Sequence, residues 1–239
     1  MAHRTSGRSA DEIVATLADL SLFASLTDGA RASIANRFER IAFERDEVIV
    51  FEGAPPDWLY VVLDGFVKLV KHSDDGREII LHVATRGDMI GGVSAFGRRP
   101  HPFTAQAMVP SVALRAAGPD FAALMKDHPD VASQTVTLLI DELTEAHETA
   151  KSLATERVER RIARQLVKLT TKLGRPTPGG VEIAVPLARQ DVADLAGTTV
   201  ESAIRVLSRW RRAGLVRTVD GRLVVEDMAR VRALAEEPL

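Results

Sequence analysis

The thirty residues from Leu187 to Val216, LARQDVADLAGTTVESAIRVLSRWRRAGLV, constrain the fold of this chain most, because they predict two short amphipathic helices joined at Gly197. Glycine supplies the backbone freedom that a tight turn needs, and Thr198 or Thr199 can cap the second helix. The apolar face of that helix is predicted to comprise Ala203, Val206, Leu207 and Trp210. This pattern is typical of a helix-turn-helix.

The opposite face of the second helix carries side chains that can read DNA bases. Glu201 and Arg205 are one turn apart near the start of the helix, where a recognition helix meets base edges. Arginine can donate two hydrogen bonds to guanine, and glutamate can accept one from cytosine. The alternative is an ordinary salt bridge on the surface of a helical hairpin. The residues predicted to contact DNA are Arg189, Thr198, Thr199, Val200, Glu201, Ile204, Arg205 and Ser208.

The segments on either side of the two helices predict a small sheet. After Gly214, two β-branched runs are joined by Asp220-Gly221, a pair that favours a type I′ hairpin. The run VEIAV at 181–185 predicts a third strand before the helices. Together these elements indicate a winged helix, a module that binds double-stranded DNA.

Residues 186–216 resemble the DNA-binding domain of the bacterial Crp/Fnr transcription regulators. The family core E-[ST]-[VI]-x-R appears here as ESAIR at 201–205, so the resemblance implies that Glu201 and Arg205 read a palindromic TTG- or TGA-like site. Family members commonly have a small residue where this chain has Ile204, and an exposed isoleucine is better suited to contact a thymine methyl. The base that faces Ile204 is therefore left open.

The region from Asp46 to about Arg115 alternates apolar and polar residues with a period of two, interrupted by glycines, which predicts an all-β barrel or roll. Residues 52–92 resemble the cyclic-nucleotide-binding-type β-roll that forms the sensor of Crp/Fnr proteins. Its tight turns are predicted at Gly53, Gly65, Gly76 and Gly87.

The predicted ligand turn of the roll departs from the pattern of cyclic-nucleotide binders. Those proteins hold the phosphate with a G-E-[LIV] turn and a later R-[ST]-A segment, but this chain has GGV at 91–93 and PFTA at 102–105. The missing Glu and Arg disfavour a cyclic nucleotide, and GRRPHPFTAQAM at 97–108 is closer to the Fnr-like branch. Two loop arginines can substitute for the missing one, although surface charge is their commoner role. The candidate effector pocket comprises Gly91, Gly92, Arg98, Arg99 and Thr104.

The chain contains no cysteine, which excludes disulfides, zinc ribbons and the cysteine-ligated iron–sulfur cluster of the oxygen-sensing branch. No pair of histidines has metal-ligand spacing, so no metal site is predicted and each is expected on the surface or in packing. Haem binding remains an alternative, because some relatives sense nitric oxide through haem. A regulator of the same fold that responds to cyclic nucleotide, or to haem and nitric oxide, is the alternative function. The six histidines are His3, His72, His82, His101, His128 and His147.

A long helix is predicted from His128, with Pro129 in its first turn and an apolar pattern that continues without interruption to about Leu173. One face has heptad spacing, which predicts the seam of a parallel homodimer. Val131, Leu138 and Ile140 are expected to contact the roll; a helix packed only on its own roll is the alternative. The seam comprises Ala132, Val136, Leu139, Leu143, Ala146, Ala150 and Leu153.

The predicted fold is α+β in three parts: a sensor β-roll with N-terminal helices at 1–127, a dimerisation helix at 128–155 and a winged-helix domain at 156–239. The net charge of −2 is unevenly distributed, because seven bases and only two acids lie between Glu156 and Arg175. These bases predict a solvated helix face, with some side chains reaching DNA phosphate as the alternative.

The sequence contains no nucleotide-binding glycine loop and no catalytic motif of a metalloprotease or α/β-hydrolase, so an enzyme is not expected. It has no long apolar run, and its polar start lacks a signal-peptide core, which predicts a cytoplasmic protein without membrane contact. The resemblance implies that the hairpin at 72–77 touches RNA polymerase. No residue pattern assigns the signal or the controlled genes.

Overall fold

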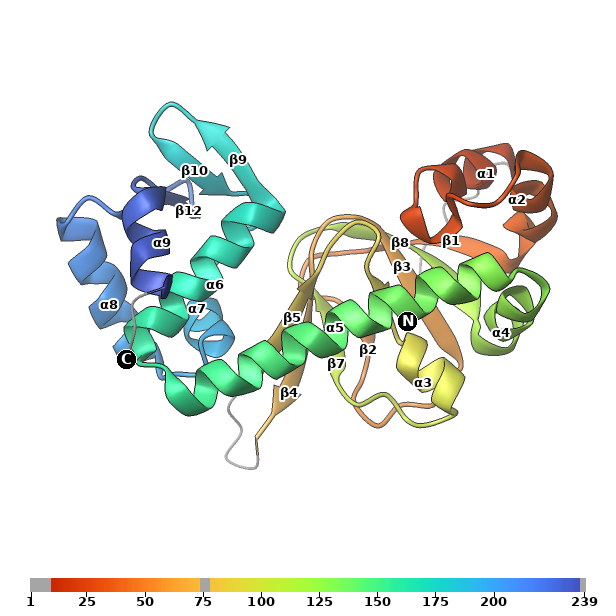
Figure 1. Cartoon of the computed structure of the whole chain (residues 1–239), viewed down its shortest axis with the longest axis horizontal. Coiled ribbons are helices and arrows are strands. Elements are labelled where there is room, and N and C mark those ends of the chain that lie inside the picture. Colours follow the sequence, from red (N-terminus) through yellow and green to blue (C-terminus); the bar gives the residue numbers. More distant parts are fainter. Residues whose placement is uncertain (1–9, 74–77, 237–239) are drawn as a thin grey trace. The chain divides into compact units, whose positions relative to one another are not determined.

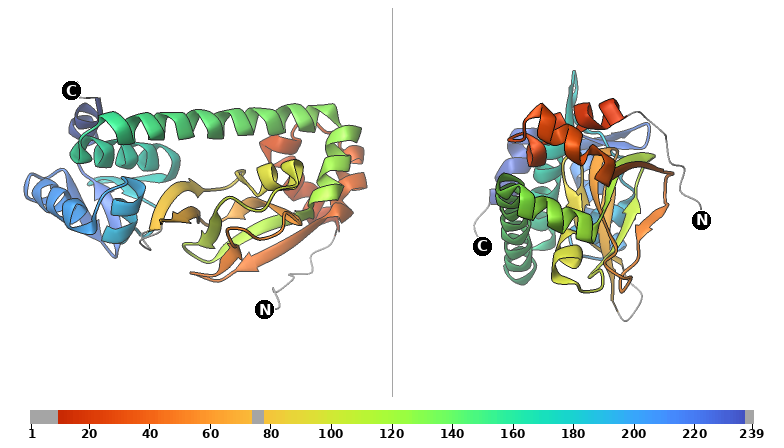
Figure 2. Two further views of the ribbon diagram at one scale, coloured as in Figure 1. Left: turned by 90° about the horizontal axis from the view of Figure 1, so that it is seen from below. Right: turned by 90° about the vertical axis from the view of Figure 1, so that its right-hand side faces the viewer.

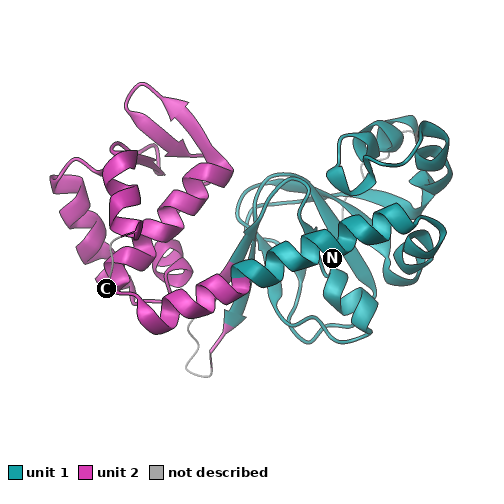
Figure 3. Cartoon of the chain, viewed as in Figure 1, with its two compact units in different colours: residues 1–71, 82–145 teal, residues 72–81, 146–239 magenta. Residues whose placement is uncertain are grey.

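The computed structural model describes residues 10–73 and 78–236. The chain separates into two compact units, one of residues 1–71 and 82–145 and one of residues 72–81 and 146–239 (Figure 3). The division falls inside helix α5 (Pro129–Thr155), ten residues before the end of that helix.

The first unit begins with helices that cover one end of a β-roll (Figure 1). Helix α1 (Ala10–Ala18) and helix α2 (Asp28–Ile34) alternate with the 3-10 turns η1 (Ser21–Phe23) and η2 (Ala35–Arg37). Thr27 caps α2, because its hydroxyl accepts a hydrogen bond from the Ala30 amide at 3.3 Å.

The predicted β-roll is confirmed. It is built from two four-stranded sheets of order β1-β8-β3-β6 and β2-β7-β4-β5. Strand β1 was not predicted, because its buried residues do not alternate regularly: Phe38, Ile41 and Phe43 are buried. The strands are β1 (Phe38–Phe43), β2 (Val48–Val50), β3 (Trp58–Asp64), β4 (Val67–His72), β5 (Glu78–Ala84), β6 (Met89–Ile90), β7 (Thr104–Ala107) and β8 (Ser111–Ala117).

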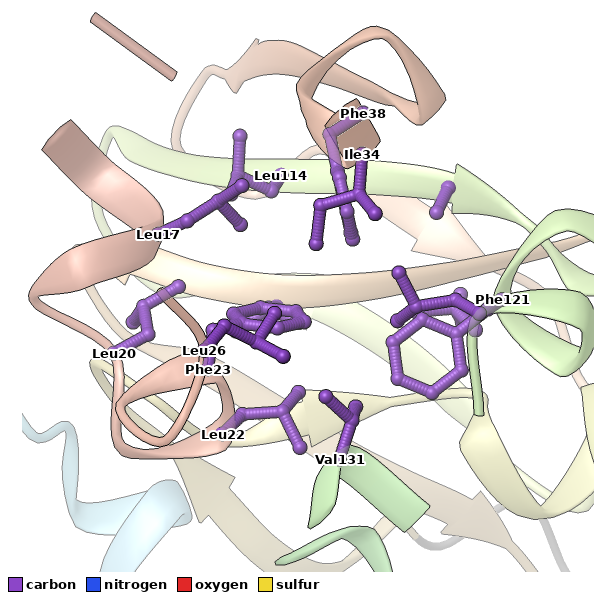
Figure 4. Packing of buried hydrophobic residues seen from close by; sticks show 14 of the residues in the cluster. Leu17, Leu20, Leu22, Phe23, Leu26, Ile34, Phe38, Leu114, Phe121 and Val131 are labelled. Atoms are coloured by element: carbon purple, nitrogen blue, oxygen red, sulfur yellow. The ribbon is translucent and has the colours of Figure 1, made fainter. Parts of the chain in front are cut away.

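A large apolar cluster joins the N-terminal helices to the roll and to the start of α5 (Figure 4). The ring of Phe23 packs edge-on against Phe38 at 5.4 Å and against Phe121 at 6.5 Å between centroids. Phe121 lies on α4 (Gly118–Asp127), and Val131 on α5 completes the cluster. The cluster therefore anchors the first turn of α5 to the roll.

Three of the four predicted glycine turns are confirmed: φ is +79° at Gly53, +88° at Gly65 and +90° at Gly87, whereas Gly76 lies outside the described residues. Gly65 is required for two reasons. Its left-handed backbone disfavours other residues, and a Cβ there would lie 2.2 Å from the Ser111 hydroxyl oxygen.

The prediction of one helix from His128 to Leu173 is wrong. Helix α5 ends at Thr155, and helix α6 (Val158–Leu173) begins after Arg157, whose backbone is extended at φ −69° and ψ 152°. Figure 2 shows α5 itself as a continuous rod. The apolar pattern crossed the break because each of the two helices has an apolar face of its own.

Helix α5 contacts the roll through one face of its first half. Val131 and Thr135 are buried, and Leu138 is partly buried against the apolar cluster. The predicted roll contact of Ile140 is wrong, because 56% of that residue is exposed. The spacing of Val131, Thr135 and Leu138 follows one helical stripe, which leaves the opposite face of α5 uncovered in the single chain.

The second unit contains the predicted winged helix. Its sheet has the order β11-β12-β10-β9, so the three predicted strands are joined by a fourth, β9. Strand β9 was missed because Gly174-Arg175-Pro176-Thr177 has no apolar alternation. The type I′ turn is confirmed by positive φ at Asp220 and Gly221. The elements after α6 are β9 (Gly174–Thr177), β10 (Gly180–Ile183), α7 (Arg189–Leu195), α8 (Val200–Arg212), β11 (Val216–Val219), β12 (Arg222–Val225) and α9 (Met228–Glu236).

Candidate DNA-binding site

Helices α7 and α8 form the predicted helix-turn-helix, with Gly197 in the turn at φ +56°. The Thr198 amide donates to the Ala193 carbonyl at 2.9 Å, which closes the end of α7. The start of α7 is held by the Asp191 carboxylate, which accepts from the Ala188 amide at 2.7 Å. The turn therefore has a defined geometry on both sides.

Helix α8 begins where the sequence predicted, because Thr199 is its cap. The Thr199 hydroxyl accepts a hydrogen bond from the Ser202 amide at 3.3 Å, and its backbone is extended. The predicted inner face is confirmed, since each of its members is at most 8% exposed: Ala203, Val206, Leu207 and Trp210.

The outer face of α8 presents the side chains predicted to read bases. Glu201 and Arg205 are exposed, and Ile204 is 44% exposed between them. Val200 and Ser208 are half-buried at its edges. Within the described part of the chain the Glu201 side chain has no hydrogen bond or ion pair, and the Arg205 guanidinium donates only to the Ser202 hydroxyl at 3.2 Å. The alternative of a Glu201–Arg205 salt bridge is therefore wrong, and both side chains remain available to an external partner.

Arg189 connects the helix pair to the wing, which is the hairpin of β11 and β12. Its Nη2 donates to the Thr218 hydroxyl at 3.4 Å, which joins the first residue of α7 to β11. The wing is held further by ion pairs of Arg217 with Glu226 at 3.0 Å and of Arg222 with Glu182 at 3.5 Å. Arg189 is thus a predicted DNA contact whose side chain also ties α7 to β11.

The basic stretch of α6 differs from its prediction. Arg160, Arg161 and Arg164 are half-buried and donate to acceptors within this unit, so a solvated face is wrong for them. Arg161 reaches the carbonyls of Ala196 and Gly197, which belong to the helix-turn-helix. The excess of bases in this stretch did not predict these contacts. The two acids of the stretch could have done so, because both Glu156 and Glu159 form ion pairs with arginine.

The predicted seam residues share one face of α5. Val136 and Leu143 are 54% and 56% exposed, so this face presents large apolar side chains to solvent in the single chain. Ala146 and Ala150 are also exposed, and Ala132 and Leu139 are half-buried. Leu153 differs from the others, because its side chain lies against Gly197: a Cβ on that glycine would be 2.4 Å from Leu153 Cδ2.

The candidate effector residues differ in burial and come from the ligand turn, α3, the loop after it and β7. Gly91 and Gly92 are buried at the start of α3 (Gly92–Gly97), a helix that the sequence did not predict. Arg98 and Arg99 are exposed, as expected of surface charge. Thr104 binds the Glu52 amide through its hydroxyl at 3.0 Å.

A buried histidine occupies the space beside the ligand turn. His101 is 2% exposed, and its Cε1 lies 2.7 Å from the position of a Cβ on Gly91. Burial lowers the pKa of His101, although the nearby charge of Asp57 opposes that shift. Its Nδ1 and the Ser94 hydroxyl are both buried without a partner among the described atoms. These groups do not fit a cyclic phosphodiester, which needs a buried guanidinium and capping amides.

Comparison with known proteins agrees with both halves of the fold. The family model of the cyclic nucleotide-binding domain matches residues 40–128, and that of the Crp-like helix-turn-helix domain matches residues 160–234. The chain is a member of the Crp/Fnr family. Proteins of this family are DNA-binding transcriptional regulators, so α7 and α8 are the DNA-binding helix pair of a Crp/Fnr regulator.

Individual relatives match nearly the whole of this Crp/Fnr regulator. It is 27% identical over 224 residues to the CRP-like cAMP-activated global transcriptional regulator of Mycobacterium tuberculosis. The aligned region covers 92% of this chain and 97% of that relative. The chain is 29% identical over 196 residues to the nitrogen fixation regulation protein FixK of Bradyrhizobium diazoefficiens, covering 82% and 81%. A CRP-family transcriptional regulator from Thermus thermophilus superposes with a TM-score of 0.71 at 27% identity, covering 83% of this chain and 97% of that one.

In residues 10–73 and 78–236, no helix has the length and apolar character needed to cross a membrane. The same residues contain no group of three or more His, Asp or Glu side chains that could hold a metal ion.

Proposed function

We propose that this protein is a homodimer in the cytoplasm that reads a palindromic TTG- or TGA-like site with two copies of α8 and takes its signal at the β-roll. The observation that carries the proposal is the exposed face of α8, on which Glu201 has no partner in the described part of the chain and Arg205 has only a serine hydroxyl. Exposed charges this close to the start of a helix suit base edges in a major groove.

The two charged side chains have complementary roles in this proposal. Arg205 donates to the O6 and N7 atoms of a guanine, and Glu201 accepts from the N4 group of a cytosine. Ile204, between them, contacts a thymine methyl, so the half-site prefers thymine at that position. Thr198 and Thr199 lie at the helix start, where hydroxyls and amides suit phosphate oxygens.

Dimerisation through α5 supports this site, because one recognition helix covers only a few base pairs. A two-fold dimer presents two such helices to two half-sites about one helical turn apart. The uncovered face of α5 with Val136, Ile140 and Leu143 supplies the apolar contact for a second copy. The hairpin at 72–77 is the proposed contact with RNA polymerase; residues 74–77 lie outside the described residues.

The signal of this regulator differs, in this proposal, from that of the mycobacterial relative. That protein is named as cAMP-activated, but the ligand turn here has two exposed arginines and a buried histidine in place of a buried guanidinium. We therefore infer that the β-roll of this chain responds to something other than a cyclic nucleotide.

Duplex binding tests the proposal directly. Fluorescence anisotropy would compare a TTG…CAA-type palindrome, a duplex with only one half-site and a scrambled duplex of equal length, each over a range of salt concentrations. We expect the palindrome to bind at least about a thousandfold more tightly than the scrambled duplex, with affinity falling as salt rises. Equal affinity for the palindrome and the single half-site would contradict the dimeric reader.

A further inference from the structure

A buried carboxylate lies at the break between α5 and α6. The side chain of Glu156 is 5% exposed. It accepts hydrogen bonds from the Ser152 hydroxyl at 2.5 Å and from Arg164 Nε at 3.2 Å, and Arg164 Nη2 also donates to it. Arg160 Nε lies 3.4 Å from the same carboxylate. Ser152 is on α5 and both arginines are on α6, so one side chain joins the two helices across the break.

The charge balance keeps this carboxylate ionised. Burial by itself raises the pKa of Glu156, but the hydrogen bonds from Arg164 and Ser152 and the charges of Arg164 and Arg160 outweigh it and lower the pKa overall. A paired carboxylate in a buried position tolerates little displacement, because any movement that breaks the pairs leaves uncompensated charge.

A neighbouring arginine links the same break to the helix-turn-helix. Arg161 donates to the Glu156 backbone carbonyl at 2.9 Å, to the Ala196 carbonyl at 2.8 Å and to the Gly197 carbonyl at 3.0 Å. The last two acceptors form the end of α7 and the turn before α8. A planar guanidinium that bridges three carbonyls fixes their relative positions more firmly than a flexible ammonium would.

Two additional contacts bind the recognition helix to the same region. Leu153, near the end of α5, packs on Gly197 in the turn. Glu159, on α6, accepts from Trp210 Nε1 at 2.7 Å and pairs with Arg209, so α8 is also attached to α6. All these residues belong to the compact unit that includes residues 146–239.

From these contacts we propose that Glu156 and Arg161 are positioning residues for DNA binding: they join the last turns of α5, the α5–α6 break and the turn before α8 into one rigid body. The break is therefore not a free hinge, and a displacement of the end of α5 moves the recognition helix with it. The consequence for regulation rests on the proposed function, in which α5 dimerises, whereas the rigid body is a property of the single chain.

An intrachain distance measurement tests the rigid body. Because the natural chain has no cysteine, Glu148→Cys on α5 and Arg211→Cys on α8 introduce the only thiols, and both positions are exposed. Spin labels at these positions report the α5–α8 distance by pulsed electron resonance. Mixing with excess unlabelled protein leaves mostly one labelled chain per assembly. The result therefore holds for a monomer as well as for a dimer, and failure of the proposed dimer would not affect it.

The variants separate positioning from simple stability. We expect Glu156→Gln and Arg161→Lys to broaden a narrow distance distribution, while Asp141→Asn, which removes an exposed charge from the same helix, leaves it unchanged. Arg161→Lys keeps the positive charge and loses the planar guanidinium. The distance measurement can therefore be made on this variant if Glu156→Gln fails to fold. Both folded variants should also bind the palindrome between about 2- and 30-fold more weakly. Narrow distributions in the folded variants, with a lower melting temperature alone, would overturn the proposal.

Discussion

Glu201 and Arg205 are exposed side chains whose proposed role depends on their spacing along one helix and not on any neighbour. For this reason they were identified from the sequence, and the structure adds only that neither is committed to a salt bridge with the other. Ile204 is a similar case, since its 44% exposure follows from its place on the polar face. The cap and the apolar periodicity of a helix together indicate which of its positions are exposed.

Replacing Arg205 tests base reading at the scale of one side chain. We expect Arg205→Ala to weaken binding to the palindrome by about 1–3 kcal/mol and to reduce discrimination at one G·C pair. Anisotropy with a set of duplexes substituted at that pair measures both effects at fixed salt. Arg232→Ala, an exposed arginine on α9, is the matched control. An equal loss on every duplex would instead identify Arg205 as a phosphate contact.

Glu156 has a stability effect whose dependence on pH can be derived. Its pKa is lowered in the folded chain, so its pairs add stability above the ordinary value of 4.5, and that stability disappears as pH falls through the lowered value. We expect Glu156→Gln to lose about 1–3 kcal/mol of unfolding free energy at neutral pH. Urea unfolding at several pH values should show the difference from the natural protein shrinking below pH 4.5. A difference that is constant with pH would contradict this account.

Helix α5 shows how two faces of one element serve different partners. Val131, Thr135 and Leu138 face the apolar cluster of the roll, whereas Val136, Ile140 and Leu143 are exposed in the single chain. Heptad spacing predicted Val136 and Leu143 of the second set, but it assigned Ile140 to the roll contacts, because neighbouring stripes of a helix overlap in sequence.

Disrupting the exposed stripe tests dimerisation at the scale of the helix. Leu143→Glu places a charge where a second copy would pack, and we expect sedimentation velocity to show monomers and the affinity for the palindrome to fall at least tenfold, which is about 1.4 kcal/mol. Asp141→Glu, at an exposed neighbouring position, is the control and should leave both properties unchanged. An unchanged DNA affinity in the Leu143→Glu variant would exclude α5 as the seam.

The whole molecule combines a DNA-binding domain that keeps the base-reading residues of the family with a β-roll whose ligand turn lacks the residues of cyclic-nucleotide binders. In the described part of the chain, the turn that gives cyclic-nucleotide binders their phosphate site is followed by α3, two exposed arginines and the buried His101. Fold and ligand chemistry are therefore separate properties, because the strands of the roll are specified by apolar alternation and the ligand by a few side chains at one turn.

Ligand addition tests the sensor in the complete chain. We expect neither cyclic AMP nor cyclic GMP to raise the melting temperature, because the turn offers no buried guanidinium to the phosphate in the described structure. Differential scanning fluorimetry at increasing nucleotide concentration measures this, and a concentration-dependent rise would contradict it. An absorption spectrum before and after addition of haem tests the remaining alternative, since binding would produce a Soret band.

The sequence alone determined the elements whose signal is local. Period-two alternation and turn glycines specified most of the roll, and Gly197, the threonine cap and the Asp220-Gly221 turn specified the winged helix. The tertiary structure decided that the helical pattern from His128 to Leu173 is broken into α5 and α6, and it decided the partners of the α6 arginines. These features depend on groups that meet only after folding: Arg161 and Gly197 are 36 residues apart in the chain. Periodicity records which face of an element is buried, but not which distant carbonyl or carboxylate will lie against it.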